Sequence, residues 1–404
     1  MSKRLGILAF ALFFFGGCYE TGMRGVESLA GVYNAPPKVR VLIAKSVGPE
    51  QKIEIRSQGP FVIYEASQSV TLLKGANLPA GRLSVTDEGV KLGEKLLAKG
   101  RIVIDGKEQG YIGVNDRLFR GMVMVIPEGD GKYSLINVLD LETYLRGVIP
   151  SEMPKDWPED ALRAQTIASR TWTLFQIKTH AKNPYDVTKD IFSQVYGGAS
   201  VESETTDQAI DDTRGVILLY QKQLYESYYH SCCGGHTANV LTVWPKYEYI
   251  VPSLQGVKDP YCAMTPYSSW RISFTKAQIV SAFQKAFPGA DFSSLQEIVP
   301  LEVGPSGHAS KVRLMMAKGN TEISADGLRK FLGVQSIQSH QMLTLRSTRF
   351  SVVREGDNFW LSGKGNGHGV GLCQWGTREM ALKKKGVQEI LAHYYPASKL
   401  WRIY

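Results

Sequence analysis

The sequence has little of what a membrane-spanning or a nucleic-acid-binding protein requires. Beyond an apolar stretch from Leu5 to Phe15, no run approaches the roughly 20 apolar residues that a membrane helix needs. We find no zinc finger, helix-turn-helix or aromatic-basic RNA motif, and therefore expect no nucleic-acid partner. Long basic runs are also absent, although Lys and Arg outnumber Asp and Glu by 47 to 38. The net charge of +9 favours an anionic partner.

The N-terminus predicts an exported protein. Met1 to Arg4 is basic, and the apolar stretch that follows is too short to span a bilayer, as in a signal peptide. Residues 16–18 resemble a bacterial lipobox, in which the cysteine is lipidated after cleavage, although Phe15 stands where leucine is usual. We therefore expect lipidation at Cys18 and a lipoprotein tethered to a membrane surface. The alternative is ordinary signal-peptide cleavage, with Cys18 lost or left as a free thiol.

Cysteine is scarce, with four residues beyond Cys18. Because an exported protein meets an oxidising compartment, these four can form two disulfides in three possible pairings. Metal binding is the competing interpretation, since Cys233 and His236 lie three residues apart on a Gly-rich turn and can both reach one ion. Disulfides, a metal site and free thiols are therefore all open. Further candidate ligands are Cys232, Cys262, Cys373, His230 and His368.

Composition divides the chain into four segments. Residues 1–18 form the signal peptide with its lipobox-like end, and residues 19–37 are Gly-rich and weakly apolar, as in a tether. Residues 38–127 contain β-branched runs between Gly-containing turns, which predicts a β-rich N-terminal part packed on residues 128–404. The whole pattern predicts a strand-rich α+β fold. The expected strands of the β-rich part are Val39–Ile43, Ile53–Ile55, Phe61–Tyr64, Leu83–Val85, Arg101–Ile104 and Met122–Ile126.

The stretch from Tyr144 to Thr171 places Glu152 between an apolar helical segment and a second helix. Pro154 and Pro158 prevent a continuous helix through the acid, because proline lacks a donor and clashes with the preceding turn. A capping box from Asp156 to Glu159, or alternatively a cap at Trp157, is expected to start the second helix, which runs to about His180. Apolar residues at helical spacing follow: Ala161, Ala164, Ala168, Trp172 and Phe175.

A carboxylate held on a proline-stiffened turn suits a general acid, and a structural role at a helix end is the alternative. Partial burial against Met153 and Trp157 would raise the pKa of Glu152 toward neutrality. Other carboxylates that could assist are Asp156, Glu159, Asp160 and Glu142.

Three separated motifs resemble the stage II sporulation protein D (SpoIID) family, which also includes the LytB amidase enhancers. The first reads YLRGVIPSEMP, a tryptophan, and then ALRAQTIASRT, from Tyr144 to Thr171. The second, residues 231–237, resembles the S-x-C-G-G-x-T loop of the family. The third, residues 363–376, is similar to G-x-G-x-G-H-G-V-G-M-x-Q-x-G-A, with Thr377 where alanine is usual. The motifs occur in family order, and the resemblance spans about residues 38–400.

The resemblance implies that the protein acts on peptidoglycan with residues 128–404 as its catalytic core. The glutamate before the methionine of the first motif is the catalytic acid proposed for the family, and that position is Glu152. Some members hold zinc at the second motif, where Cys233 and His236 are the matching residues. In the Gly-rich third motif, His368 and Gln374 could hydrogen-bond sugar hydroxyls and Trp375 could stack on a sugar face. For His368, satisfying buried carbonyls is the competing role. Gln165, a polar residue inside an apolar helix stripe, is a further candidate substrate contact.

The implied activity is that of an exported lytic transglycosylase, which cuts glycan strands stripped of stem peptides and leaves 1,6-anhydro-muramic ends. A single acid agrees with this chemistry, because the 6-hydroxyl of the sugar attacks in place of water, whereas a hydrolytic glycosidase uses two carboxylates. The rival class is a non-catalytic cell-wall-binding module that enhances an amidase. A zinc hydrolase that uses the Cys–His loop is a third interpretation.

Overall fold

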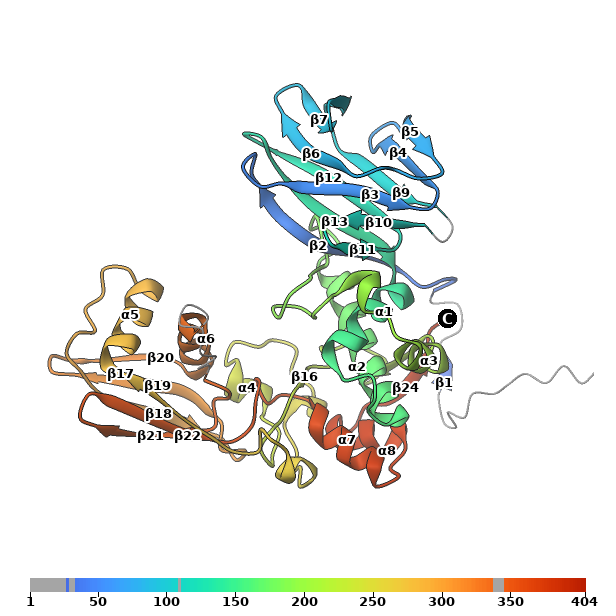
Figure 1. Cartoon of the computed structure of the whole chain (residues 1–404). Coiled ribbons are helices and arrows are strands. Elements are labelled where there is room, and N and C mark those ends of the chain that lie inside the picture. Colours follow the sequence, from blue (N-terminus) through green and yellow to red (C-terminus); the bar gives the residue numbers. More distant parts are fainter. Residues whose placement is uncertain (1–26, 29–32, 108–109, 337–344) are drawn as a thin grey trace, which may run out of the picture.

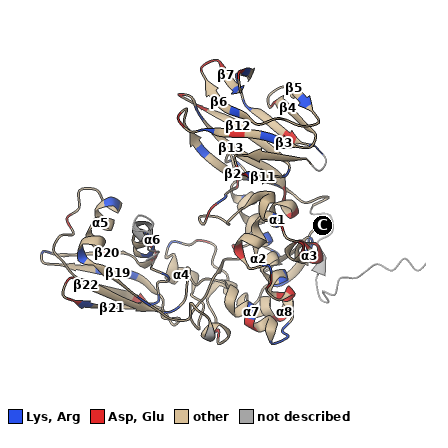
Figure 2. Ribbon diagram, in the orientation of Figure 1, with Lys and Arg blue, Asp and Glu red and all other residues tan. Residues whose placement is uncertain are grey.

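The computed structural model describes residues 27–28, 33–107, 110–336 and 345–404. The predicted signal peptide, and with it Cys18, lies outside the described residues. Three parts are evident in Figure 1: a β-rich part at the top, a helical part in the centre, and a second mixed unit beside the helical part. Lys and Arg occur in all three parts (Figure 2).

Two sheets form the β-rich part and enclose one core, to which both contribute residues such as Ile104 and Ile55. The seven-stranded sheet has the order β14 (Val187–Thr188), β2 (Lys38–Val47), β13 (Lys132–Asp140), β12 (Met122–Gly129), β9 (Ile102–Gly106), β4 (Phe61–Glu65) and β5 (Thr71–Gly75). The six-stranded sheet has the order β11 (Arg117–Phe119), β10 (Tyr111–Val114), β3 (Ile53–Gln58), β6 (Gly81–Thr86), β7 (Gly89–Leu92) and β8 (Lys95–Ala98).

The β-rich part continues directly into the helical part. β13 pairs antiparallel with both β12 and β2, so the expected boundary after residue 127 falls inside a sheet. Asp140 at the end of β13 accepts a hydrogen bond from the backbone N–H of Thr143 and thereby caps the next helix. The buried side chains of that helix, Leu141, Tyr144, Leu145 and Val148, join the core of the sheets. This packing fixes the helix that carries Glu152.

The helical part surrounds a second core. Its helices are α1 (Leu141–Glu152), α2 (Glu159–Thr179), α3 (Glu204–Asp212), α4 (Val240–Val243), α7 (Gln374–Leu382) and α8 (Val387–Tyr394). Its short 3-10 helices are η1 (Gly198–Val201), η2 (Pro252–Leu254) and η3 (Tyr261–Met264). A small sheet has the order β1 (Glu27–Ser28), β24 (Lys399–Arg402) and β15 (Val216–Leu219). A parallel pair, β16 (Tyr229–His230) and β23 (Leu372–Cys373), brings the second and third motifs together.

The third part has its own core, which includes Phe283, Leu314 and Leu328. One antiparallel sheet has the order β17 (Trp270–Thr275), β22 (Asn358–Gly363) and β21 (Phe350–Glu355). The other has the order β18 (Leu295–Val303), β19 (Ala309–Met316) and β20 (Asn320–Ser324). Helices α5 (Lys276–Ala286) and α6 (Ala325–Ser336) complete the unit, which is inserted between the strands of the β16–β23 pair.

The structure confirms the predicted strand-rich α+β class, and each of the six expected N-terminal strands has its counterpart. The predicted start of α2 is wrong. The cap is Pro158, whose carbonyl accepts from the N–H groups of Ala161 and Leu162, and no side chain caps the helix. Asp156 and Trp157 both lie before this cap, in the backbone turn that starts at Pro154.

Candidate active site and thiol cluster

Glu152 is the last residue of α1. Met153 adopts an extended conformation and its N–H bonds Ile149 O, which ends the helix before Pro154. The predicted helix break is therefore correct, but the acid belongs to the final helical turn and not to the turn after it. Unpaired carbonyl groups at a helix C-terminus disfavour a negative charge, so this position suits a protonated acid.

The immediate surroundings of Glu152 set its ionisation. Its Oε1 accepts a hydrogen bond of 2.7 Å from the backbone N–H of Val195. Burial raises the pKa of Glu152, while the Val195 N–H and, to a lesser extent, the Tyr229 hydroxyl oppose the rise. The Tyr229 hydroxyl makes no hydrogen bond of ordinary geometry, although it lies close enough to influence the carboxyl group. The result is an acid with raised pKa, which is the property that general-acid catalysis needs.

Glu152 lines a cavity of about 450 Å³. Two of its other lining residues, Ile191 and Phe192, are 83% and 78% exposed, so apolar side chains stand at its mouth. The expected desolvating residue Trp157 is not part of the lining, and aromatic residues from elsewhere take that role. These are Trp172, Tyr228, Tyr229 and Trp244.

Two of the four predicted substrate contacts, His368 and Gln374, line the cavity with Glu152. Gln374 Nε2 donates to the carbonyl of Glu152 at 3.0 Å and to Gln165 Oε1 at 3.4 Å. Gln165 is fully buried and its own Nε2 donates to Ser169, so it holds Gln374 and does not reach the cavity. Trp375 also lies outside the lining, where its ring packs 4.9 Å from that of Trp157.

Both histidines of the cavity are neutral imidazoles. Burial lowers the pKa of His230 to about 4, and burial together with His230 holds that of His368 well below its usual value. His368 Nδ1 accepts from the backbone N–H of Val370, which places its ring proton on Nε2. His230 Nδ1 faces Val370 O at 3.1 Å, so it donates and leaves Nε2 as an acceptor without a partner. His230 Nε2 is therefore a buried acceptor within the wall of the cavity.

The four carboxylates that were expected to assist Glu152 lie outside the cavity, and three of them form ion pairs with arginines. Glu142 forms a buried ion pair with Arg170, at 2.8 Å, and Glu159 and Asp160 pair with Arg163. Neither these three nor the exposed Asp156 line the cavity.

A second carboxylate, that of Asp326 on α6, also lines the cavity, and the sequence analysis did not predict it. Burial acts against its charge, but Arg329 and Lys330 lower the pKa of Asp326 below its ordinary value. Asp326 is therefore a paired carboxylate, while Glu152 has no cationic partner among the described residues.

Glycines allow the second and third motifs to touch. Gly371 has a φ of 73°, and a Cβ at this position would collide with the carbonyl oxygen of Tyr228. At Gly234, with a φ of 69°, a Cβ would lie 2.7 Å from Lys364 Cβ and 2.8 Å from the nitrogen of Gly365. These contacts explain the Gly-rich sequence as a packing requirement.

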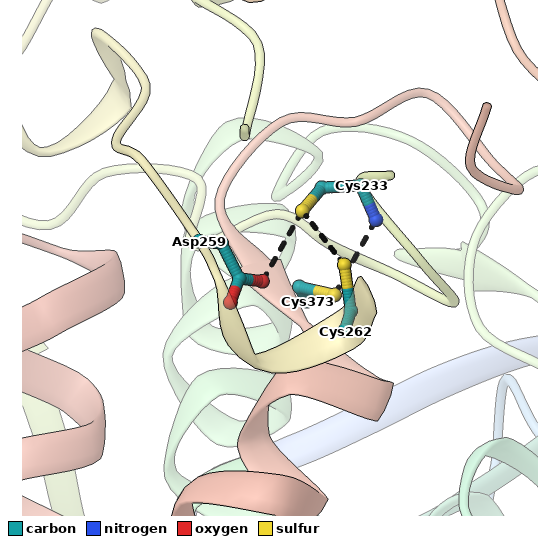
Figure 3. Close-up of side chains that lie close together, drawn as sticks. All are labelled: Cys233, Asp259, Cys262 and Cys373. Carbon is teal, nitrogen blue, oxygen red and sulfur yellow. Dashed lines mark hydrogen bonds between the residues drawn. The ribbon is translucent and has the colours of Figure 1, made fainter. Parts of the chain in front are cut away.

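A buried cluster of three thiols and a carboxylate includes Cys233 of the second motif and Cys373 of the third (Figure 3). Cys233 Sγ lies 3.1 Å from Asp259 Oδ2 and 3.4 Å from Cys262 Sγ. Cys373 Sγ completes the group, and the potential ligand atoms of all four residues lie within 4.8 Å of one another. Backbone N–H groups of Gly235 and Gly376 also point at the sulfurs of Cys233 and Cys373. This donor set could bind a metal ion.

The other predicted ligands occupy different positions. His236 Nδ1 lies 2.8 Å from Thr237 O, and the residue is not one of the four clustered groups. Cys232 lies beside the cluster, and hydrogen bonding with Cys262 raises its pKa to about 11. Burial raises the pKa values of Cys233 and Cys373, whereas neighbouring thiols lower that of Cys262. All four thiols are free in the structure.

Two segments of the chain match two different protein families. Residues 129–220, which carry Glu152, match the family described as Stage II sporulation protein (SpoIID). Over 343 residues the chain is 30% identical to an uncharacterized protein of Brachyspira hyodysenteriae, covering 84% of this chain and 87% of that protein. The chain belongs to the SpoIID family.

Two named members of the SpoIID family show the same relationship. Stage II sporulation protein D of Bacillus subtilis is 29% identical over 278 residues, which cover 65% of this chain and 74% of the relative. The amidase enhancer of Bacillus subtilis is 29% identical over 290 residues, covering 63% of this chain but only 40% of the enhancer. Residues 259–371, which contain the inserted third part, match a domain of unknown function, DUF8618.

SpoIID family membership makes this chain one of a group of cell-wall remodelling proteins. Within the described residues, no helix has the length and apolar character needed to cross a membrane.

Proposed function

We propose that this SpoIID protein is a lytic transglycosylase that cleaves peptidoglycan glycan strands with Glu152 as general acid and then general base. The observation that carries the proposal is a half-buried carboxyl group in a cavity, with a raised pKa and no ion pair within the described residues. Glu152 first donates its proton to the glycosidic oxygen. It then accepts the proton of the 6-hydroxyl as that oxygen attacks the anomeric carbon, so that no water is consumed.

The surroundings of Glu152 support this chemistry in two ways. Aromatic walls from Tyr228 and Trp244 suit sugar faces. The other carboxylate of the cavity, Asp326, is neutralised by Arg329 and Lys330 and is a poor base for activating water. The preferred substrate is a strand stripped of stem peptides.

Turnover of purified glycan strands tests the proposal. Glu152→Gln keeps the size and the acceptor for Val195 N–H but removes the transferable proton, so cleavage should fall by at least about 100-fold. Glu159→Gln, an exposed carboxylate on α2, is the matched control and should cut normally. Full activity in Glu152→Gln would show that another residue is the catalytic acid. Absence of cleavage by the folded wild type would instead favour the rival function of a non-catalytic module that enhances an amidase.

For the thiol cluster we propose a structural zinc ion. Buried thiolates are costly without a cation, and thiolate sulfur with one carboxylate oxygen is a donor set that zinc accepts in tetrahedral sites. Cys233, Cys262 and Cys373 would supply three ligands, and either Asp259 or Cys232 the fourth. The ion would join the second motif, η3 and the start of α7, behind the catalytic cavity. His236, the ligand expected from the sequence, would not take part.

Export and membrane attachment through a lipid on Cys18 complete the proposal. Cys18→Ser should abolish lipid labelling and release the protein from the membrane fraction, because a short apolar leader alone does not anchor a mature protein.

A further inference from the structure

A second hollow of about 520 Å³ adjoins the cavity of Glu152. The two share three lining residues, Trp244, Asp326 and Lys330, so they meet at the N-terminal half of α6. One wall of the second hollow is the segment from Val243 to Lys246 after α4, and the other consists of β19, β20 and α6. The inserted third part therefore borders the substrate path proposed above.

Positive charge is in excess in this hollow. Asp326, whose side chain is 6% exposed, pairs at once with Arg329 at 3.0 Å and Lys330 at 2.8 Å, so one carboxylate faces two cations. The Lys330 side chain is 55% exposed, which leaves its ammonium group accessible beside the shared wall. Lys246 on the opposite wall is exposed and forms no ion pair within the described residues.

The remaining charges of the hollow are already paired. Lys311 contacts Glu302 at 2.8 Å, and Glu322 contacts Arg313 at 2.8 Å. Lys246 is therefore the lining cation that forms no ion pair within the described residues, while Lys330 on the other wall shares the carboxylate of Asp326 with Arg329.

An aromatic surface separates the two hollows. The ring of Trp244 packs 4.7 Å from that of Tyr228 and 5.2 Å from that of His368, so its position is fixed by neighbours of the catalytic cavity. Trp244 lines both hollows, and Val243, Pro245 and Ile323 add further apolar surface to the second. A site with an apolar floor and a few cationic groups suits a sugar ring that bears a carboxylate.

We propose that the second hollow is a glycan subsite in which Lys246 and Lys330 read the free lactyl carboxylate of a muramic acid residue. The inference rests on the proposed action on peptidoglycan and extends it. The lactyl group is attached to the sugar ring itself, so its carboxylate stays close to a ring that stacks on Trp244. In a peptide-bearing strand the same group is an uncharged amide. The subsite thus selects stripped strands by charge, and it assigns a role to the inserted third part.

The affinities of the full-length protein for three glycans, measured at equilibrium, distinguish which group the lysines bind. Three ligands of matched length are needed: stripped glycan with lactyl carboxylates, peptide-bearing glycan with carboxylates only on the peptide, and an N-acetylglucosamine oligomer without any. The wild type should bind stripped glycan most tightly. Lys246→Gln/Lys330→Gln should weaken that binding roughly tenfold, as expected for a lost charge-assisted hydrogen bond, and leave the oligomer unaffected.

Two controls keep the test specific. Lys74→Gln/Lys132→Gln removes the same charge from exposed positions in the β-rich part and should change none of the three affinities, which excludes general electrostatic attraction. Lys246→Gln alone breaks no ion pair, so its folding is secure, and it should lose part of the preference. Unchanged affinity of the Lys246/Lys330 variant for stripped glycan would overturn the subsite.

Preference for peptide-bearing glycan that disappears in the Lys246/Lys330 variant would show that the lysines read peptide carboxylates, and would also overturn the proposal. If the folded wild type binds no glycan at all, the proposed function fails together with the subsite. Binding without any preference overturns the subsite alone.

Discussion

At the scale of single residues, the raised pKa of Glu152 makes the stability of the folded protein depend on pH. Because its pKa is raised in the folded protein, the folded state binds this proton more tightly than the unfolded state. The corresponding stabilisation is fully present below the unfolded pKa of about 4.3 and is lost as the pH rises through the folded pKa. Near neutral pH the half-buried carboxylate of Glu152 therefore lowers the free energy of unfolding.

Glu152→Gln should consequently raise the melting temperature at pH 7.5 and give no advantage near pH 4, where the wild-type acid is protonated. Thermal unfolding followed by circular dichroism at the two pH values measures the difference, with Glu159→Gln as the exposed control. A variant that is less stable than the wild type at pH 7.5 would mean that the carboxylate is stabilised by partners that outweigh its burial.

The sequence drew attention to Glu152 but did not predict its surroundings. Pro154 and Pro158 next to an apolar helix pattern are local signals, and so Glu152 could be found. Its main partner, by contrast, is a backbone N–H at Val195, 43 residues away, and a backbone donor has no residue-type signature. Asp326 was missed for a related reason, since only the folded third part brings α6 to the cavity.

At the scale of elements, the packing of α1 on α2 depends on a buried ion pair. Arg170 is fully buried and donates to both oxygens of Glu142, and also to Thr213 Oγ1 and to the carbonyls of Val216 and Ile210. Glu142 accepts further bonds from the Gly215 N–H and the Tyr404 hydroxyl. The pair therefore ties both helices to the chain between α3 and β15 and to the C-terminus.

Arg170→Met should lower the free energy of unfolding by about 3–5 kcal/mol, because it leaves an uncompensated buried carboxylate. Denaturant titration measures the loss. Adding Glu142→Gln should restore part of it by removing the orphaned charge. Arg163→Gln, which breaks only partly exposed pairs, should cost about 1 kcal/mol or less. Equal losses in Arg170→Met and Arg163→Gln would contradict this account.

The thiol cluster makes a second prediction at this scale. Purified protein should contain one zinc ion per chain by elemental analysis, and removing it with a chelator should lower the melting temperature. The bound ion is worth roughly 4 kcal/mol when free zinc stands at 1,000 times its Kd. Cys262→Ser should lose the metal, and comparison of Asp259→Asn with Cys232→Ser identifies the fourth ligand. Metal-free protein with oxidised cysteines would instead establish the disulfides that sequence alone left open.

At the scale of the whole molecule, the candidate site depends on three separately packed parts. The sheets of the β-rich part hold α1, the helical part supplies the cavity, and the inserted part closes one side of it through α6. Local patterns predicted the strands of the β-rich part and the helices on either side of Pro154. They did not predict that residues 270–363 form a unit with its own core, because period and propensity say nothing about which apolar faces pack together.

The end groups of the cleaved glycan test the central claim most directly. Stripped strands digested by the purified wild type, in water enriched in heavy oxygen, are analysed by mass spectrometry. A lytic mechanism with Glu152 as the only proton carrier predicts 1,6-anhydro-muramic ends, lighter by one water than hydrolysis products and free of heavy oxygen. Reducing ends that carry heavy oxygen would contradict it, and would make Asp326 the first candidate for the second carboxylate of a hydrolase.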